Sequence, residues 1–385
     1  MCERAAFVRA CEEGEDSIAE LCRQFGISRK TGYKWLERVR IEGEDGLQER
    51  NRAPHHHPNA VSMEMEEAIL HVRQKRNWGP KKIAISLSRT WPSSEIPSVS
   101  TIGDILKRKG LVVSRKRKRH ATPSSQPLAH ATDANRVWCA DFKGWFCTGD
   151  GNRVDPLTIT DAYSRFLLGC QEMRGKTNTE HVMGVFTTLF RTYGIPERIR
   201  TDNGTPFAST GLAGLSRLSA WWIRLGIIPE RIKPATPSEN GQHERFHLTL
   251  KLETASPPAS TPKKQQEAFD EFQKIYNEER PHEALGQATP ASLYQASARP
   301  FPKRLPPVEY PDDMAVRRVR GAGQIQWHRK DYLVTRALCY QPVGLQPVDD
   351  GVWLVFYCHV CIGIFDERKP HIQPLKLTSK YNIPI

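Results

Sequence analysis

Three acidic residues, Asp141, Asp202 and Glu244, stand where a folded chain could bring them together. Asp141 lies in a predicted strand, Asp202 at the tip of a later predicted strand, and Glu244 in a predicted helix. Carboxylates gathered in one pocket repel each other unless cations neutralise them, so a converging trio indicates Mg²⁺ or Mn²⁺. We expect two ions, because a pair can activate the attacking oxygen and stabilise the leaving oxygen in phosphoryl transfer.

The segment Arg200–Phe207 contains Asp202-Asn203-Gly204, which puts a carboxylate where the chain must turn sharply after a strand. We expect Asn203 and Gly204 to shape this turn, and the same motif also makes an ordinary tight turn. Alone, Asp141 also fits an exposed strand position, and Glu244 fits a charged helix. The metal-site hypothesis therefore depends on the three acids occurring together.

Residues 134–295 show the alternation of strands and helices that is typical of an α/β domain. Three predicted strands come first, and a helix with apolar residues at helical spacing follows over residues 179–192. The strand before Asp202, a glycine- and serine-rich loop over residues 207–219, a helix from Ala220 and a short edge strand come next. This order would place the acidic residues at the end of one sheet.

Residues 1–50 are predicted to fold as a helix-turn-helix domain. Ser17 and Ser28 are candidate N-caps, and Gly26 allows a left-handed turn between the two helices. An αα-hairpin in another kind of helical domain would have the same pattern. In a DNA-binding domain the second helix reads the major groove, and its expected DNA contacts are Arg29, Lys30, Tyr33 and Lys34.

A linker over residues 51–60 precedes a second helix-turn-helix-like domain, residues 61–120, which ends in a polybasic arm. Such an arm neutralises phosphates without reading sequence, although a charge run is often only a solvated tail. A second linker covers residues 121–133. The expected DNA contacts of this part are Lys81, Lys82, Arg115, Lys116, Arg117, Lys118 and Arg119.

Residues 300–385 contain short alternating strands between glycines and prolines, and they predict a small all-β barrel. Cys358 and Cys361 form a CxxC pair in a stretch that resembles a strand. The nine cysteines include no second pair to complete four ligands, so we interpret them as reduced structural thiols and not as a zinc site.

The composition favours a DNA-binding protein with about two to four domains. The 385 residues include 56 Lys and Arg against 43 Asp and Glu, a net charge of +13, and the pI is about 9.4. This surplus predicts a polyanionic partner. No apolar run approaches the ~20 residues that span a bilayer, and the N-terminus lacks the apolar core of a signal peptide. We therefore expect a cytoplasmic, nucleoid-associated protein without a membrane partner.

Three blocks, Trp138–Phe142, Tyr193–Phe207 and Pro237–Arg245, resemble those of DDE transposases in the retroviral-integrase superfamily. Tyr276–Gly286 and Thr289-Pro290 resemble the tail block of bacterial insertion-sequence transposases. Together the blocks span roughly residues 135 to 295 in the family's order. The resemblance implies a multidomain chain with an α/β ribonuclease H-like catalytic core.

The resemblance also implies that Asp141, Asp202 and Glu244 are the catalytic residues and metal ligands. Glu239 is the rival for the third position, but the family's glutamate follows the small residue by three, which is Glu244 after Gly241. The separation of the second and third acids is longer than in integrases, and a surface loop can absorb that excess. Lys251 lies on the Glu244 face and is a candidate phosphate contact, or a plain surface lysine.

The function implied is that of a DNA transposase, which cleaves strands at the ends of an insertion element and transfers them by attack of the freed 3′-hydroxyl. Its expected partners are the terminal inverted repeats, target DNA and further copies of the chain. One alternative is a metal-dependent nuclease that does not join strands. Another is a DNA-binding repressor with a catalytically inactive integrase-like domain.

Overall fold

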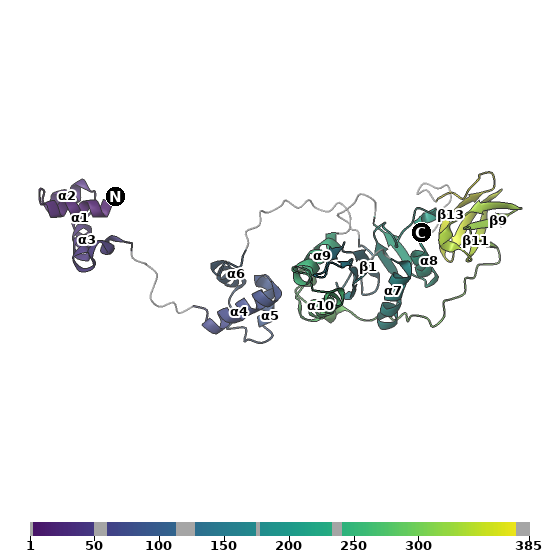
Figure 1. Ribbon diagram of the computed structural model, residues 1–385, viewed down its shortest axis with the longest axis horizontal. Helices are drawn as coiled ribbons and strands as arrows, with labels where there is room; N and C mark the ends of the chain where they lie inside the picture. Colours follow the sequence, from purple (N-terminus) through teal and green to yellow (C-terminus); the bar gives the residue numbers. More distant parts are fainter. Residues whose placement is uncertain (1–2, 50–59, 113–127, 175–177, 233–240, 375–385) are drawn as a thin grey trace. The chain divides into compact units, whose positions relative to one another are not determined.

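The computed structural model describes residues 3–49, 60–112, 128–174, 178–232 and 241–374 (Figure 1). The chain divides into two compact units, Met1–Val61 and Ser62–Ile385. None of the helices described is long and apolar enough to cross a membrane.

The first unit has the helices expected of a helix-turn-helix domain. Ser17 Oγ accepts a hydrogen bond from Glu20 N, and Ser28 Oγ accepts one from Thr31 N, so both predicted N-caps are confirmed. The rings of Phe25 and Trp35 pack edge-on against buried Phe7. The elements are α1 (Glu3–Glu13), α2 (Ile18–Gln24), α3 (Arg29–Glu42) and the 3-10 helix η1 (Gly43–Leu47).

The second unit begins with three more helices, α4 (Met63–Arg76), α5 (Pro80–Leu87) and α6 (Val99–Arg108). Ser62 caps α4 and Ser98 caps α6, each by accepting a hydrogen bond from a backbone N–H in the first helical turn. The three helices pack against one another through their buried apolar residues.

A five-stranded sheet organises the α/β core, in the order β5-β4-β1-β6-β7. β4 is antiparallel to both β1 and β5, whereas β6 is parallel to both β1 and β7. This mixed sheet is the α/β core that the alternation of strands and helices predicts. The strands are β1 (Val137–Phe142), β4 (Leu157–Asp161), β5 (Leu167–Gln171), β6 (Arg198–Thr201) and β7 (Ile228–Arg231), with the small hairpin β2 (Phe146–Cys147) and β3 (Arg153–Val154) after β1.

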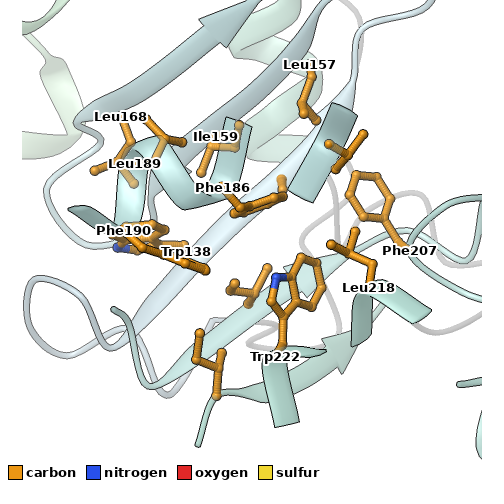
Figure 2. Packing of buried hydrophobic residues seen from close by; sticks show 14 of the residues in the cluster. Trp138, Leu157, Ile159, Leu168, Phe186, Leu189, Phe190, Phe207, Leu218 and Trp222 are labelled. Carbon is orange, nitrogen blue, oxygen red and sulfur yellow. The ribbon is translucent and has the colours of Figure 1, made fainter. Parts of the chain in front are cut away.

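Helices cover the sheet through two separate apolar clusters. The larger cluster joins Trp138 of β1 and Ile159 of β4 to the aromatic residues of α7 and α8, and Figure 2 shows the rings of Trp138 and Phe190 beside each other. A second cluster joins Leu167 of β5 to α9 and α10. The helical elements are α7 (Thr179–Tyr193), η2 (Leu212–Gly214), α8 (Arg217–Arg224), α9 (Gly241–Thr254), α10 (Pro262–Lys274), the π-helix η4 (Ile275–Glu279), η5 (Glu283–Leu285) and α11 (Pro290–Leu293).

The predicted loop over residues 207–219 is too long, because α8 already begins at Arg217. Ser216 and Ser219 form a reciprocal capping box, in which each side chain bonds the other residue's backbone N–H. Serines in a polar run favour a loop prediction, but here they start the helix.

The C-terminal strands form two sheets, and among the residues described they do not close into a barrel. The larger sheet has the order β13-β12-β11-β8 and the smaller pairs β9 with β10. Side chains, including Trp327 and Phe365, join the two sheets without a continuous hydrogen-bond ladder. The elements are β8 (Ala315–Arg318), β9 (Gln324–Trp327), β10 (Lys330–Leu333), η6 (Arg336–Leu338), β11 (Pro342–Asp349), β12 (Val352–Tyr357) and β13 (Val360–Asp366).

The CxxC pair lies at the hairpin between β12 and β13 and not within one strand. Cys358 has a φ of 50°, which belongs to the turn, and Cys361 is already in β13. The cysteines of the described ranges are all free thiols.

We predict that Phe186→Ala destabilises the core. Phe186 is fully buried and its ring contacts those of Phe190 and Trp222. Removing a buried phenyl ring costs about 3–5 kcal/mol of unfolding free energy. Urea unfolding followed by tryptophan fluorescence would measure the loss. His181→Ala, an exposed change on the same helix, is the control and should leave the midpoint unchanged.

Candidate active site

Asp141, near the end of β1, and Asp202, directly after β6, occupy neighbouring positions at one edge of the sheet. β1 and β6 are parallel neighbours with Ala140 opposite Thr201, and each aspartate is the next residue along its strand direction. Both aspartates are half-buried. The carboxyl ends of parallel strands are where open α/β sheets bind ligands, so this edge is the candidate active site.

The turn after β6 fixes the Asp202 side chain. Gly204 N donates to Asp202 Oδ1 at 3.1 Å, and Asn203 Nδ2 donates to the carbonyl oxygen of Ile232 at 2.8 Å. A Cβ atom at position 204 would lie 3.0 Å from Asp202 Oδ2. A side chain at position 204 would therefore displace the carboxylate, and Asn203 and Gly204 shape the turn as the sequence predicts.

Thr158 links helix α9 to the backbone at Asp141. Thr158 is directly opposite Asp141 in the β1–β4 pair. Its Oγ1 donates to the Asp141 carbonyl oxygen at 3.0 Å, and it lies 3.1 Å from His243 Nε2 and 2.9 Å from His247 Nε2. A hydroxyl has one proton to donate, so both histidines donate from Nε2 and Thr158 accepts.

Both histidines are uncharged at neutral pH. Burial lowers the pKa of His243 to about 4. Burial, then the neighbouring His243 and Lys143, lower the pKa of His247 to about 3. Sequence reasoning missed this pair, although two histidines four residues apart around Glu244 share one helical face.

Glu244 lies in the first turn of α9, between the two anchoring histidines, and its side chain is exposed. Anionic side chains are favoured at a helix N-terminus by the aligned backbone dipoles. The structure thus brings Asp141 and Asp202 to one edge and places Glu244 on the helix that Thr158 holds near Asp141. Within the described ranges, no three His, Cys, Asp or Glu side chains are grouped to hold one metal ion. Glu239 lies outside those ranges.

The predicted DNA contacts of α3 form an exposed row. Arg29, Lys30, Tyr33 and Lys34 are exposed, whereas Trp35 is partly buried against Phe7. Arg115, Lys116, Arg117, Lys118 and Arg119 lie outside the residues described.

The lysines of α5 contact other parts of the second unit. Lys81 Nζ lies 2.8 Å from Glu283 Oε1. Burial, and then the nearby Arg280, lower the pKa of Lys82 to about 8. Lys251 of α9, in contrast, is exposed. Intramolecular contacts therefore already involve both α5 lysines.

His282 is partly buried in the segment that follows η4. Its ring packs edge-on against Tyr276, with the centroids 4.7 Å apart, and it lines a hollow of about 240 Å³ together with Arg165, Arg245 and Arg280. Burial, followed by the charges of Lys82 and Arg280, lowers the pKa of His282 to about 3.

We predict that Thr158→Val lowers the unfolding free energy, because it removes the hydrogen bonds that join α9 to β4. Valine has nearly the same shape but leaves the Nε2–H groups of His243 and His247 without their acceptor, at a cost of about 1–3 kcal/mol. Urea unfolding measures this loss. The matched control is Thr160→Val on the same strand, a buried residue that lines the hollow beside His282 and has no side-chain hydrogen bond among the described residues. Equal stability of the two variants would contradict the anchoring role.

We predict that His282 makes the fold acid-sensitive. The pKa of an unfolded histidine is about 6.5, whereas burial lowers the pKa of folded His282 to about 3. The unfolded state therefore binds more protons in that window, and the unfolding free energy falls as the pH falls through it. In unfolding curves recorded across the window, His282→Asn should make this dependence shallower, and the lowered pKa values of His243 and His247 account for the remainder. His181→Asn, at an exposed position, should not change the dependence.

The sequence matches family models over most of the regions just described. Residues 131–237 and 225–290 match two models of an integrase core domain. Residues 3–55 match a helix-turn-helix domain, and residues 31–106 match a homeodomain-like domain.

Curated relatives are proteins of bacterial insertion elements. An uncharacterized 31.7 kDa protein of insertion element IS407 from Burkholderia multivorans is 27% identical over 186 residues, which is 48% of this chain and 64% of that protein. The transposase InsD of insertion element IS2 from Escherichia coli is 28% identical over 240 residues, which is 57% of this chain and 74% of the transposase. The chain thus spans less than two thirds of the first of these relatives.

Among solved structures, the simian T-cell lymphotropic virus intasome in complex with a PP2A regulatory subunit is similar at 15% identity and a TM-score of 0.38. The match covers 78% of this chain and 96% of that one. The chain is therefore similar to integrase core domains over residues 131–290, to helix-turn-helix domains near its N-terminus, and to proteins of bacterial insertion elements.

Proposed function

We propose that this chain is a DNA transposase that cleaves strands at the ends of an insertion element and joins them to target DNA. Asp141, Asp202 and Glu244 are its proposed catalytic residues and metal ligands. The observation that carries the proposal is the parallel register of β1 and β6, because it puts Asp141 and Asp202 at one sheet edge in a chain with an integrase core.

The donor set fits Mg²⁺ or Mn²⁺ by its chemistry. Both ions prefer carboxylate oxygens, and two half-buried aspartates leave adjacent strand ends here. Asp141, Asp202 and Glu244 would hold the ions, and we propose two. Bound there, the ions would acidify the attacking hydroxyl and offset the charge on the phosphate.

Both proposed reactions are phosphoryl transfers. In the first, water attacks a phosphodiester at the element end, a new P–O bond forms, and the strand leaves with a free 3′-hydroxyl. In the second, that hydroxyl attacks a target phosphodiester and the displaced target 3′-oxygen leaves. Each step exchanges one P–O bond for another, so one carboxylate site can serve both. The chain's own contribution is to hold Asp141 and Asp202 in a fixed orientation.

The partners follow from the DNA-binding elements. We propose that α3 binds the terminal inverted repeats through Arg29, Lys30, Tyr33 and Lys34. We further propose that copies of this chain assemble into homo-oligomers on DNA, at the nucleoid in the cytoplasm. The corresponding domains are residues 1–50, 61–120, 134–295 and 300–385, with linkers over 51–60 and 121–133.

A DNA-binding protein without strand transfer, either inactive or a nuclease only, is the second candidate. The observation in its favour is that the described residues contain no group of three potential ligands around one point. Activity measurements on single variants separate the two candidates.

We predict that Asp202→Asn reduces cleavage and joining of labelled element-end DNA by about a hundredfold or more, since a metal ligand matters at least as much as the groups that orient it. The reactions contain Mg²⁺ or Mn²⁺, and a gel separates nicked from joined products. DNA affinity should stay unchanged, because Asp202 is remote from α3 in sequence and carries no DNA-reading role.

Further variants test which glutamate is the third metal ligand. Glu244→Gln should match Asp202→Asn, while Glu267→Gln, an exposed change on α10, should remain active. Loss of activity in Glu239→Gln but not in Glu244→Gln would transfer the third position to Glu239. Wild-type protein that hydrolyses without joining would support the nuclease, and DNA binding alone would support the inactive candidate.

A further inference from the structure

A hollow of about 430 Å³ opens next to the candidate active site. It lies between the segment after β1 and the exposed face of α9. Lys143 follows Asp141 by two residues, and Leu248 and Lys251 follow Glu244 by one and two helical turns. The lining residues are Lys143, Gly144, Trp145, His247, Leu248 and Lys251.

Trp145 presents an aromatic ring to solvent beside this hollow, with 59% of the residue exposed. The Arg153 guanidinium lies over the ring, 4.8 Å from its centroid, and Arg153 also lies 3.7 Å from Asp155 Oδ2. One face of the indole is therefore covered and supported from β3. Gly144, with a φ of 85°, allows the turn that brings the ring to the surface.

The hollow is cationic. Lys143 and Lys251 both line it, and Lys143 Nζ lies over the Phe146 ring, 5.1 Å from the ring centroid. Among the residues described, neither lysine forms an ion pair, and Lys251 is exposed. The nearby carboxylate of Asp155 forms its ion pair with Arg153 instead, so the two lysines favour an anion beside them.

Exposed aromatic and cationic groups together fit nucleic acid better than an apolar partner. A buried role for Trp145 is excluded by its exposure, and an apolar peptide would leave both lysines desolvated. Single-stranded nucleic acid binds by stacking its bases on aromatic rings while lysines track its phosphates. Inside a duplex both faces of a base are stacked on its neighbours, so such a ring fits a base that has left the duplex stack.

We propose that Trp145 is a stacking platform for an unpaired DNA base next to the scissile phosphate, with Lys143 and Lys251 contacting the phosphates of the same strand. The inference rests on the proposed function for the identity of its substrate. To occupy the site, the DNA end must fray or carry a single-stranded overhang.

The test compares two short duplexes of the same sequence, one blunt and one with an overhang of a few nucleotides containing 2-aminopurine. Trp145→Ala should weaken binding of the overhang duplex by about tenfold, the effect of losing one base–aromatic stack. Binding of the blunt duplex should not change. Wild-type protein should quench 2-aminopurine fluorescence through stacking, and Trp145→Ala should not.

Other variants control for folding and for charge. Trp145→Phe keeps a ring and should retain most of the preference for the overhang, which separates stacking from structural damage. Tyr163→Ala removes another exposed aromatic residue of the core and should behave as wild type. Lys143→Gln should weaken both duplexes and reduce the salt dependence by about one phosphate contact.

The stacking role would be overturned, even in an active transposase, if Trp145→Ala weakened the binding of both duplexes equally or left the quenching of 2-aminopurine fluorescence unchanged. Conversely, an overhang preference that depends on Trp145 would support it even if the wild-type protein neither cleaved nor joined DNA. Binding and quenching therefore test the stacking role of Trp145, whereas cleavage and joining test the transposase activity.

Discussion

The parallel pairing of β1 with β6 is the constraint on which the candidate active site depends. Ala140 opposite Thr201 makes Asp141 and Asp202 the next pair of residues at one sheet edge. Two carboxylates at neighbouring strand ends repel each other, so their placement needs stability from elsewhere. The aromatic cluster around Trp138, Ile199 and Phe186, on one face of the sheet, supplies it by burying apolar surface. The core thus stabilises a sheet edge that the carboxylates alone would disfavour.

On the opposite face of the sheet, the hydroxyl of Thr158 joins helix α9 to the backbone of Asp141. Thr158 contacts the backbone of Asp141 and both anchoring histidines of α9. Strand β4 therefore sets the distance between the first aspartate and the helix that carries Glu244. A buried polar group with all its partners satisfied orients its neighbours, whereas an unsatisfied one destabilises them. The same helix face continues through Leu248 to Lys251, which joins the carboxylate site to the hollow beside Trp145.

Local patterns allowed the helix-turn-helix caps, the α/β core and the turn at Asp202 to be predicted from sequence. Ser17, Ser28 and Gly204 act through neighbours a few residues away, so their roles are visible in a short window. The missed features are non-local. His243 and His247 gain their role only from Thr158, some 85 residues earlier, as the separation of the hydrogen-bonded pair shows. Closure of a C-terminal barrel depends on which strands pair, and the pairing that would have closed it is absent from the strands described.

Helix α8 connects the Asp202 turn to the C-terminal sheets. Leu218 and Trp222 belong to the core cluster, whereas Leu215, Ala220 and Ile223 belong to the cluster of the C-terminal strands. At the start of the helix, Ser216 Oγ donates to the carbonyl oxygen of Phe207 at 2.9 Å, within the segment that follows Asp202. Packed interiors transmit displacement because they have little free volume. A shift of the C-terminal strands must therefore repack α8 or separate from it. Repacking of α8 would move the support of the Asp202 turn, so the position of the C-terminal strands is physically coupled to that of the Asp202 carboxylate.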